Sequence, residues 1–288
     1  PRFGVAFQLA TLARNELKAT YFVDPLFSFA LGLEPLARVI HEIGEHGQEI
    51  ALHMHPEWLT DPRCVGLPDF AGPYLWQYEL EDQRRLMHAG LARLADAGAG
   101  SIRAFRAGNY AANHDTMRAL REAGISFDTS LNACYAESFP DLAGRDEICA
   151  PSHVDGIVEF PVTTFVDRPP DRRRHMQLGA CSLSEVRYVL EQAAAAGWSA
   201  VVIVMHSFEL MRVGRFQNGG PPMHSRLLVR RFERLCEYLA ANRKWMRTSH
   251  FSDLDLASLQ EPGKAPHIVS SSLRTRARQV EQLISRFH

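Results

Sequence analysis

Apolar and polar positions follow two different periods along this chain. Segments with apolar residues three or four apart, typical of amphipathic helices, alternate with short β-branched or fully apolar runs. The first pattern predicts helices at 6–18, 33–47, 79–98, 113–124, 182–197 and 226–243, and one more near the C-terminus. The second predicts strands at 18–23, 48–53, 101–108, 125–130, 156–165 and 199–207.

The alternation of strands with helices indicates an α/β fold, in which a parallel sheet is covered by helices. Six or seven strand signals suit a barrel or near-barrel. Because no shift in composition marks a second domain, we expect one domain over 1–260 and a C-terminal loop and helix over 261–288. Asn113 or Asp115 is expected to cap one helix, and Ser182 or Ser184 with Glu185 another.

Composition narrows the possible partners. The formal net charge is −1, from 32 Lys and Arg against 33 Asp and Glu, so we expect no nucleic-acid partner. No apolar run is long enough to span a bilayer. The five cysteines form no C-x-x-C pair and their number is odd, which favours reduced thiols and a cytoplasmic location. The oligomeric state is left open.

Ionisable residues end almost every predicted strand. In a parallel barrel the carboxyl ends of the strands carry the chemistry. The residues at these ends are Asp24, His53, His55, Arg106, Asp128, Glu159 and His206. So many polar strand ends are hard to explain by packing alone.

His53 and His55 lie two apart in "ALHMHPEW", so an extended backbone points both imidazoles to one side. Neutral imidazole nitrogen suits Zn²⁺ and similar divalent ions. The alternative is a hydrogen-bonded pair at a strand end. Glu57 is a further ligand or supporting residue in the first case, and a solvated loop residue in the second.

Three more residues are catalytic candidates. His206 ends a fully apolar run, where an imidazole needs a partner and can serve as a general acid or base. Arg106 in "FRAGNY" can orient a carboxylate, although a surface arginine is the commoner case. Asp128 either pairs with Arg106 or hydrogen-bonds the turn at Thr129 and Ser130.

These motifs resemble the polysaccharide deacetylases of carbohydrate esterase family 4. The resemblance covers roughly 7–254 and rests on "LARNELKATYFV", "QEIALHMHPEW", "FRAGNYAANHDTMRALREAGISFDTS", "VEFPVTTF" and "VVIVMHS". It implies a distorted (β/α)₇ barrel and a metal-dependent hydrolase that removes N-acetyl or O-acetyl groups from an acetylated sugar or polysaccharide.

The resemblance also implies roles for individual residues. His53 would be a ligand of a divalent metal, commonly zinc, and His206 the general acid. Arg106 would orient a catalytic base, and we place Asp128 in the same catalytic set. A backbone N–H near Asn109 or Tyr110 would hold the oxyanion, and we add Trp58 to the substrate contacts.

The chain departs from the family pattern in two places. The second histidine is His55, two residues after His53, whereas the family has it four residues later, where Glu57 stands. We favour His55 as the ligand and keep Glu57 in reserve. The family's first-motif aspartates are absent, so we expect the sequence to be truncated before Pro1, with the first strand missing. Asp24 could substitute for the missing carboxylate.

Two rival functions remain open. A metal-dependent hydrolase of a non-sugar amide would also use H-x-H, but amidohydrolases place that motif on the first barrel strand. A catalytically degenerate protein that binds glycan or acts as a scaffold would account for the missing aspartates.

Overall fold

The computed structural model describes residues 3–142, 144, 148–168, 170, 172–212, 223–255 and 267–287. The chain divides into two compact units, each described here by itself. Unit 1 comprises Pro1–Lys18, Val162–Thr248 and Lys264–His288, and unit 2 comprises Ala19–Pro161 and Ser249–Gly263. The expected boundary near residue 260 stays a prediction.

Unit 2 is built on a six-stranded sheet in the order β1-β2-β3-β4-β6-β5. Its strands are β1 (Thr20–Val23), β2 (Glu49–Met54), β3 (Ala104–Ala107), β4 (Phe127–Asp128), β5 (Ser152–Val154) and β6 (Ile157–Glu159). All neighbouring pairs are parallel except β5 with β6, which form an antiparallel hairpin. The predicted α/β class with a mainly parallel sheet is confirmed.

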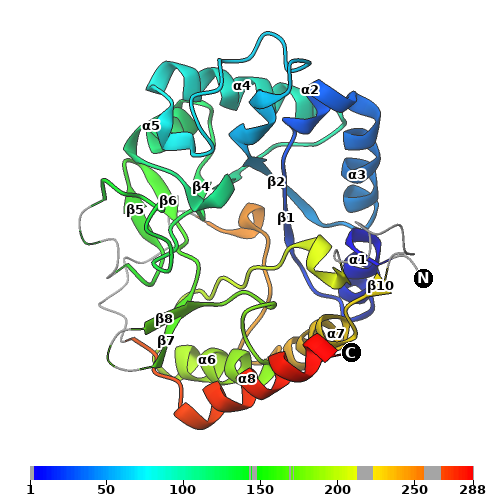
Figure 1. The fold of residues 1–288 in the computed structure, drawn as a ribbon, viewed down its shortest axis with the longest axis vertical. Coiled ribbons are helices and arrows are strands. Elements are labelled where there is room, and N and C mark those ends of the chain that lie inside the picture. Colours follow the sequence, from blue (N-terminus) through cyan, green and yellow to red (C-terminus); the bar gives the residue numbers. More distant parts are fainter. Residues whose placement is uncertain are drawn as a thin grey trace. The chain divides into compact units, whose positions relative to one another are not determined.

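Helices connect the parallel strands of unit 2, as Figure 1 shows. They are α2 (Phe27–Leu31), α3 (Leu33–Glu45), α4 (Leu80–Asp96) and α5 (His114–Glu122). Each presents an apolar face to the core, for example through Leu36 and Ile40 of α3 and Leu86 of α4. Asn113 caps α5 by accepting a hydrogen bond from the Thr116 N–H at 3.0 Å, so the capping prediction is confirmed for Asn113.

Unit 1 carries the remaining described helices and two small sheets. Its helices are α1 (Val5–Arg14), α6 (Leu183–Ala195), α7 (Arg226–Ala241) and α8 (Ser272–Phe287). The antiparallel pairs are β7 (Thr164–Arg168) with β8 (Arg172–His175), and β9 (Met211–Arg212) with β10 (Met223–His224). Ser182, not Ser184, caps α6 in a capping box with Glu185. None of the described helices has the length and apolarity needed to cross a membrane.

Two strand predictions are corrected. The segment 156–165 splits at Pro161 into β6 and β7, which belong to different sheets, because proline has no N–H to donate to a continuous ladder. The apolar run before His206 forms only one isolated bridge, between Val204 and Gln177. Its pairing is too short for a strand, although Val204 N–H still donates to Met176 O at 2.8 Å.

Helix α8 is fixed to unit 1 by buried ion pairs. Arg278 donates to Asp167 Oδ2 at 2.8 Å and to Glu185 Oε1 at 3.0 Å. The three side chains are only 3%, 1% and 0% exposed. Thr275 adds a hydrogen bond to the Asp167 carbonyl at 2.9 Å. Removing Arg278 would therefore leave Glu185 buried without a cation, whereas Asp167 would keep Arg174.

We predict that Arg278→Ala destabilises unit 1 by roughly 3–5 kcal/mol, because Glu185 then loses its buried cation. Arg276→Ala, an exposed change on the same helix, should alter stability by less than about 0.5 kcal/mol. Urea unfolding followed by circular dichroism compares the two. Equal effects would contradict the assigned role of the buried pairs.

Candidate functional site

His53 and His55 lie together at the carboxyl end of β2. Their rings are 4.7 Å apart between centroids and nearly perpendicular, at 89°. His53 Nδ1 lies 2.6 Å from the carbonyl oxygen of Arg106, its registered neighbour on β3. Since a carbonyl can only accept, Nδ1 carries the proton and Nε2 is the nitrogen with a lone pair in the neutral ring. This is how proteins commonly hold a metal-binding histidine.

Glu57 stands beside His55 in the short helix η1 (Pro56–Thr60). Its Oε2 is buried, has no hydrogen-bond partner among the described residues, and lies 3.3 Å from His55 Nδ1. Two ligand atoms that each lie about 2.0–2.1 Å from one tetrahedrally coordinated ion are separated from each other by about 3.3–3.4 Å. His55 and Glu57 thus have the spacing of a ligand pair. Asn109 Nδ2 donates to Glu57 Oε1 at 2.7 Å and fixes the carboxylate.

The described residues nevertheless contain no group of three or more His, Cys, Asp or Glu side chains arranged to hold a metal ion. His53, His55 and Glu57 are neighbours, but they do not complete such a group in this geometry. The zinc site expected from the sequence, with its ligand set, therefore stays a prediction.

Asp24, the suggested substitute ligand, follows β1 and binds backbone. Its carboxylate accepts from the Leu26 N–H at 2.9 Å and the His55 N–H at 3.3 Å. Trp58 adds a side-chain hydrogen bond, and its indole packs 6.1 Å from the Phe27 ring. Burial raises the pKa of Asp24 to about 7. The geometry makes Asp24 a support of the histidine segment.

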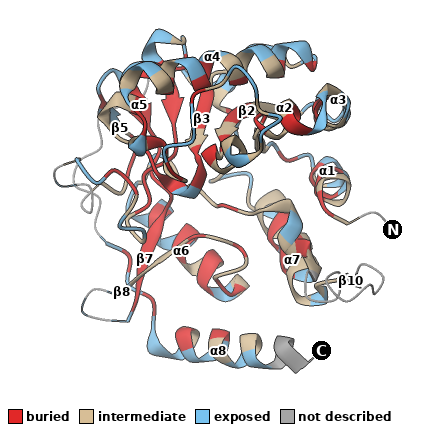
Figure 2. Cartoon of the chain, turned by 45° about the horizontal axis from the view of Figure 1, so that its top comes forward, coloured by how far each residue is buried: buried red, intermediate tan, exposed pale blue. Residues whose placement is uncertain are grey.

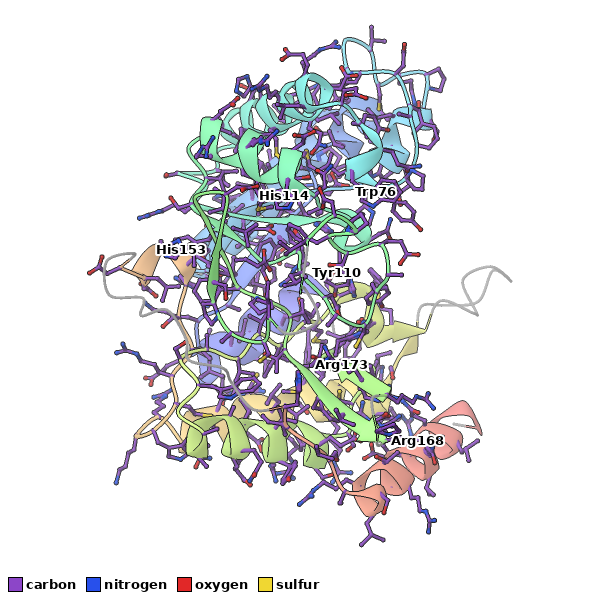
Figure 3. The ribbon with its side chains drawn as sticks, turned by 90° about the vertical axis from the view of Figure 1, so that its left-hand side faces the viewer. Trp76, Tyr110, His114, His153, Arg168 and Arg173 are labelled. Atoms are coloured by element: carbon purple, nitrogen blue, oxygen red, sulfur yellow. The ribbon has the colours of Figure 1, made fainter. Side chains whose placement is uncertain are left out.

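The turn after β3 approaches the histidines closely. Asn109 and Tyr110 adopt left-handed φ angles of 55° and 60°, which is costly for residues other than glycine and is frequent at functional sites. Tyr110, labelled in Figure 3, is buried, and its ring centroid lies 5.1 Å from that of Tyr135. Gly108 has no room for a side chain, because a Cβ there would lie 2.5 Å from Met54 O and 2.8 Å from His55 Nδ1.

We predict that Gly108→Ala destabilises the chain by about 1–3 kcal/mol and displaces the His55 ring, because the added methyl overlaps backbone that cannot yield. Gly100→Ala is the matched control, since a Cβ there meets nothing within 4 Å. Thermal unfolding and the His55 imidazole NMR shifts measure both effects. An unchanged His55 signal in the Gly108 variant would contradict the close contact.

Arg106 extends from β3 towards the following loop. Its guanidinium donates to the Thr129 carbonyl at 3.1 Å and to Thr129 Oγ1 at 3.2 Å, and lies 4.3 Å from the centre of the Phe22 ring. Asp128 accepts instead from Ser130, through Oγ at 2.6 Å and N–H at 3.1 Å. Of the two alternatives for Asp128, the hydrogen bonds favour the turn. Burial lowers the pKa of Arg106, and Asp128 attracts its charge without a direct hydrogen bond.

Asp128 and Glu159 form a buried acid pair, of which sequence reasoning placed Asp128 in the catalytic set and gave Glu159, a polar strand end, no role. They are registered neighbours on β4 and β6, and both are fully buried. Burial, followed by the charge of Asp128, raises the pKa of Glu159 well above its usual range. Burial also raises the pKa of Asp128. Glu159 Oε1 accepts from the Leu131 N–H at 2.9 Å. Its buried Oε2 accepts no hydrogen bond from the described residues, so a proton on this oxygen can be donated to Asp128.

We predict that Glu159→Gln removes part of the pH dependence of stability. Unfolded Glu159 loses its proton near pH 4.3, whereas the folded residue keeps it, so wild-type stability falls as pH rises above about 4.3. Glutamine keeps both hydrogen bonds and does not titrate. The variant should therefore match wild type near pH 4 and exceed it at pH 8.

Urea unfolding between pH 4 and pH 8 measures this difference. Glu159→Ala is the control, because it leaves the buried Leu131 N–H without its acceptor and should destabilise at every pH. If Glu159→Gln and wild type lose stability in parallel as pH rises, Glu159 is ionised in the folded protein and the protonation assignment fails.

His206 lies in unit 1, with partners of its own. Its Nδ1 is 2.9 Å from Glu209 Oε1, and Gln177 Nε2 donates to the same carboxylate oxygen. The imidazole is 42% exposed and stacks on Phe208, whereas Glu209 is 13% exposed. The sequence analysis did not identify Glu209, although an acidic residue three positions after a candidate histidine could have indicated such a pair. The pair fixes the His206 ring with Nε2 turned away from the carboxylate.

The comparisons with known proteins concern the fold. No family model and no curated protein matches this chain. Among solved structures, a "putative polysaccharide deacetylase" from Mycobacterium smegmatis aligns with a TM-score of 0.50 and 18% identity, over 91% of this chain and 82% of the other. The chain has a polysaccharide deacetylase-like fold. The resemblance noted in the sequence is therefore confirmed at the level of the fold.

Two further solved structures align less closely. A family 4 carbohydrate esterase from Streptomyces lividans, in complex with acetate, gives 13% identity and a TM-score of 0.46, with 87% of each chain covered. A CE4 family pseudoenzyme from Bacillus anthracis gives 12% identity and a TM-score of 0.33, over 57% of this chain and 52% of the other.

Proposed function

We propose that this protein is a metal-dependent hydrolase that removes acetyl groups from a carbohydrate. The observation that carries the proposal is the paired His53 and His55 at the carboxyl end of β2, with His53 Nδ1 held by the Arg106 carbonyl. The deacetylase-like fold is consistent with chemistry at this end of the strands.

In this proposal His53 and His55 would hold a divalent ion, which their donor chemistry suits to zinc, with Glu57 as the neighbouring carboxylate. When bound, such an ion polarises an acyl carbonyl and acidifies a water molecule. Asn109 holds the Glu57 carboxylate in place. The backbone at Asn109 and Tyr110 would meet the developing oxyanion, in the strained turn that Gly108 brings close to His55.

His206 is assigned the general-acid role, on the resemblance of its motif and on its pairing with Glu209. Glu209 Oε1 accepts a hydrogen bond from His206 Nδ1, so that Nε2 is the nitrogen that can pass a proton to a leaving amine or alcohol. Arg106 and Asp128 are assigned to positioning. Their hydrogen bonds to Thr129 and Ser130 fix the loop after β4.

A second function, a glycan-binding or scaffold protein without turnover, is favoured by one observation. The described residues do not complete a three-ligand metal group. The two functions differ in metal dependence, because a binding protein would need no ion for its activity.

We predict that the protein releases acetate from N-acetylated glucosamine oligomers or O-acetylated xylan in the presence of zinc. His53→Ala and His55→Ala should each abolish this activity, and His206→Ala should lower kcat by about 10²–10⁴-fold. Glu209→Gln should lower kcat while leaving KM unchanged. His41→Ala, an exposed change on α3, is the control.

The competing outcomes are distinct. Glycan binding that survives in the His53 variant without acetate release would support the binding protein. Hydrolysis of a simple amide such as N-acetyl-amino acids, with no activity on sugars, would support a non-sugar amide hydrolase.

A further inference from the structure

Helix α8 exposes the apolar residues that it carries between Leu273 and Leu283. Leu273, Val280 and Leu283 are 75%, 55% and 54% exposed, and Ala277 is exposed as well. Three of the ten large exposed hydrophobic residues in the described parts of the chain thus fall within eleven positions of one helix. Clustering of this kind marks an interaction surface more often than isolated exposed residues do.

Two polar residues of α8 face the protein instead. Arg278 and Thr275 are buried against Asp167 and Glu185, so ion pairs fix the orientation of the helix. Figure 2 shows buried and exposed residues alternating along α8. An amphipathic helix normally turns its apolar side inwards. In α8 the buried ion pairs of Arg278 turn the polar side towards the protein, so the apolar side faces outwards and is available to another molecule.

The spacing of the exposed residues suits a second helix. Leu273, Ala277 and Val280 are four and three residues apart, which is the repeat of a coiled-coil seam. At 100° per residue they fall within one narrow stripe, with Leu283 on its flank. Ala277 and Val280 are small, so two helix backbones can approach closely along this stripe.

The charges beside the stripe are complementary to those of an identical helix. Arg274 and Arg276 precede the centre of the stripe, and Glu281 follows it. In an antiparallel pair of α8 helices centred between Ala277 and Val280, Arg274 of one copy lies near Glu281 of the other. In a parallel pair, Arg276 of one copy lies near Glu281 of the other. Glu281 binds Arg231 through Oε2 and is still 43% exposed. An arginine therefore faces an acid in either orientation.

We propose that α8 is a dimerisation helix, which pairs through Leu273, Ala277 and Val280 with α8 of a second copy of this chain. An anionic membrane surface is a weaker match, because Glu281 borders the apolar stripe. The paired segments are about 24 Å long, at 1.5 Å rise for each of 16 residues. One such helix pair buries less area than a standard interface of about 1,600 Å², so the dimer should be weak and depend on concentration.

The test is sedimentation equilibrium of the full chain over a concentration series from about 1 to 200 µM, a range suited to a weak dimer. Wild type should shift from monomer to dimer. Val280→Glu and Leu273→Glu should each weaken association at least tenfold, because a carboxylate enters the seam. Val65→Glu, the same change at another exposed valine, should leave it unaltered.

The remaining outcomes overturn the proposal. A wild-type chain that stays monomeric to the highest concentration excludes dimerisation through α8, and a dimer that persists in both glutamate variants places the interface elsewhere. Circular dichroism confirms that each variant is folded. Co-sedimentation with phosphatidylserine vesicles, lost in Val280→Glu while the protein is monomeric in solution, would assign the face to a membrane instead.

Discussion

The parallel register of β2 and β3 is the constraint on which the candidate site depends. It pairs His53 with Arg106, so that the imidazole of one residue meets the carbonyl of the other. The same register lets β3 end beside β2, where Gly108 packs against Met54 and His55. A slip of one residue would turn the Arg106 side chain to the other face of the sheet. The arrangement of the candidate site around His53 and His55 therefore depends on how β2 pairs with β3.

Buried charge is treated differently in the two units. In unit 2, Asp128 and Glu159 lie side by side and are fully buried, and burial together with the charge of Asp128 raises the pKa of Glu159 well above its usual range, which favours a proton on Glu159 over two adjacent negative charges. In unit 1, Asp167 and Glu185 remain paired with arginines, Arg278 above all. The first arrangement fixes the loop after β4. The second fixes the orientation of α8 and leaves its apolar residues exposed.

Local patterns in the sequence predicted most elements, because helix periodicity and caps such as Asn113 act over a few residues. They misjudged the apolar run before His206, whose pairing depends on residues far along the chain. The strand-end rule predicted that His53, His55 and Arg106 lie close together, and they do, because parallel strands bring their ends to one edge of the sheet. It missed the role of Glu159 and Glu209, since neither burial beside Asp128 nor contact with His206 is visible in a local pattern. The orientation of α8 depends on ion pairs with residues about 90 or more positions away.

The central claim, that the paired histidines bind a divalent ion, is tested most directly by anomalous diffraction at the zinc edge from zinc-soaked crystals. The account predicts a peak about 2.0–2.1 Å from one nitrogen of His53 and one of His55. The other ligands would show whether Glu57 joins them. A map with no peak at these two residues would contradict the account and favour a structural histidine pair.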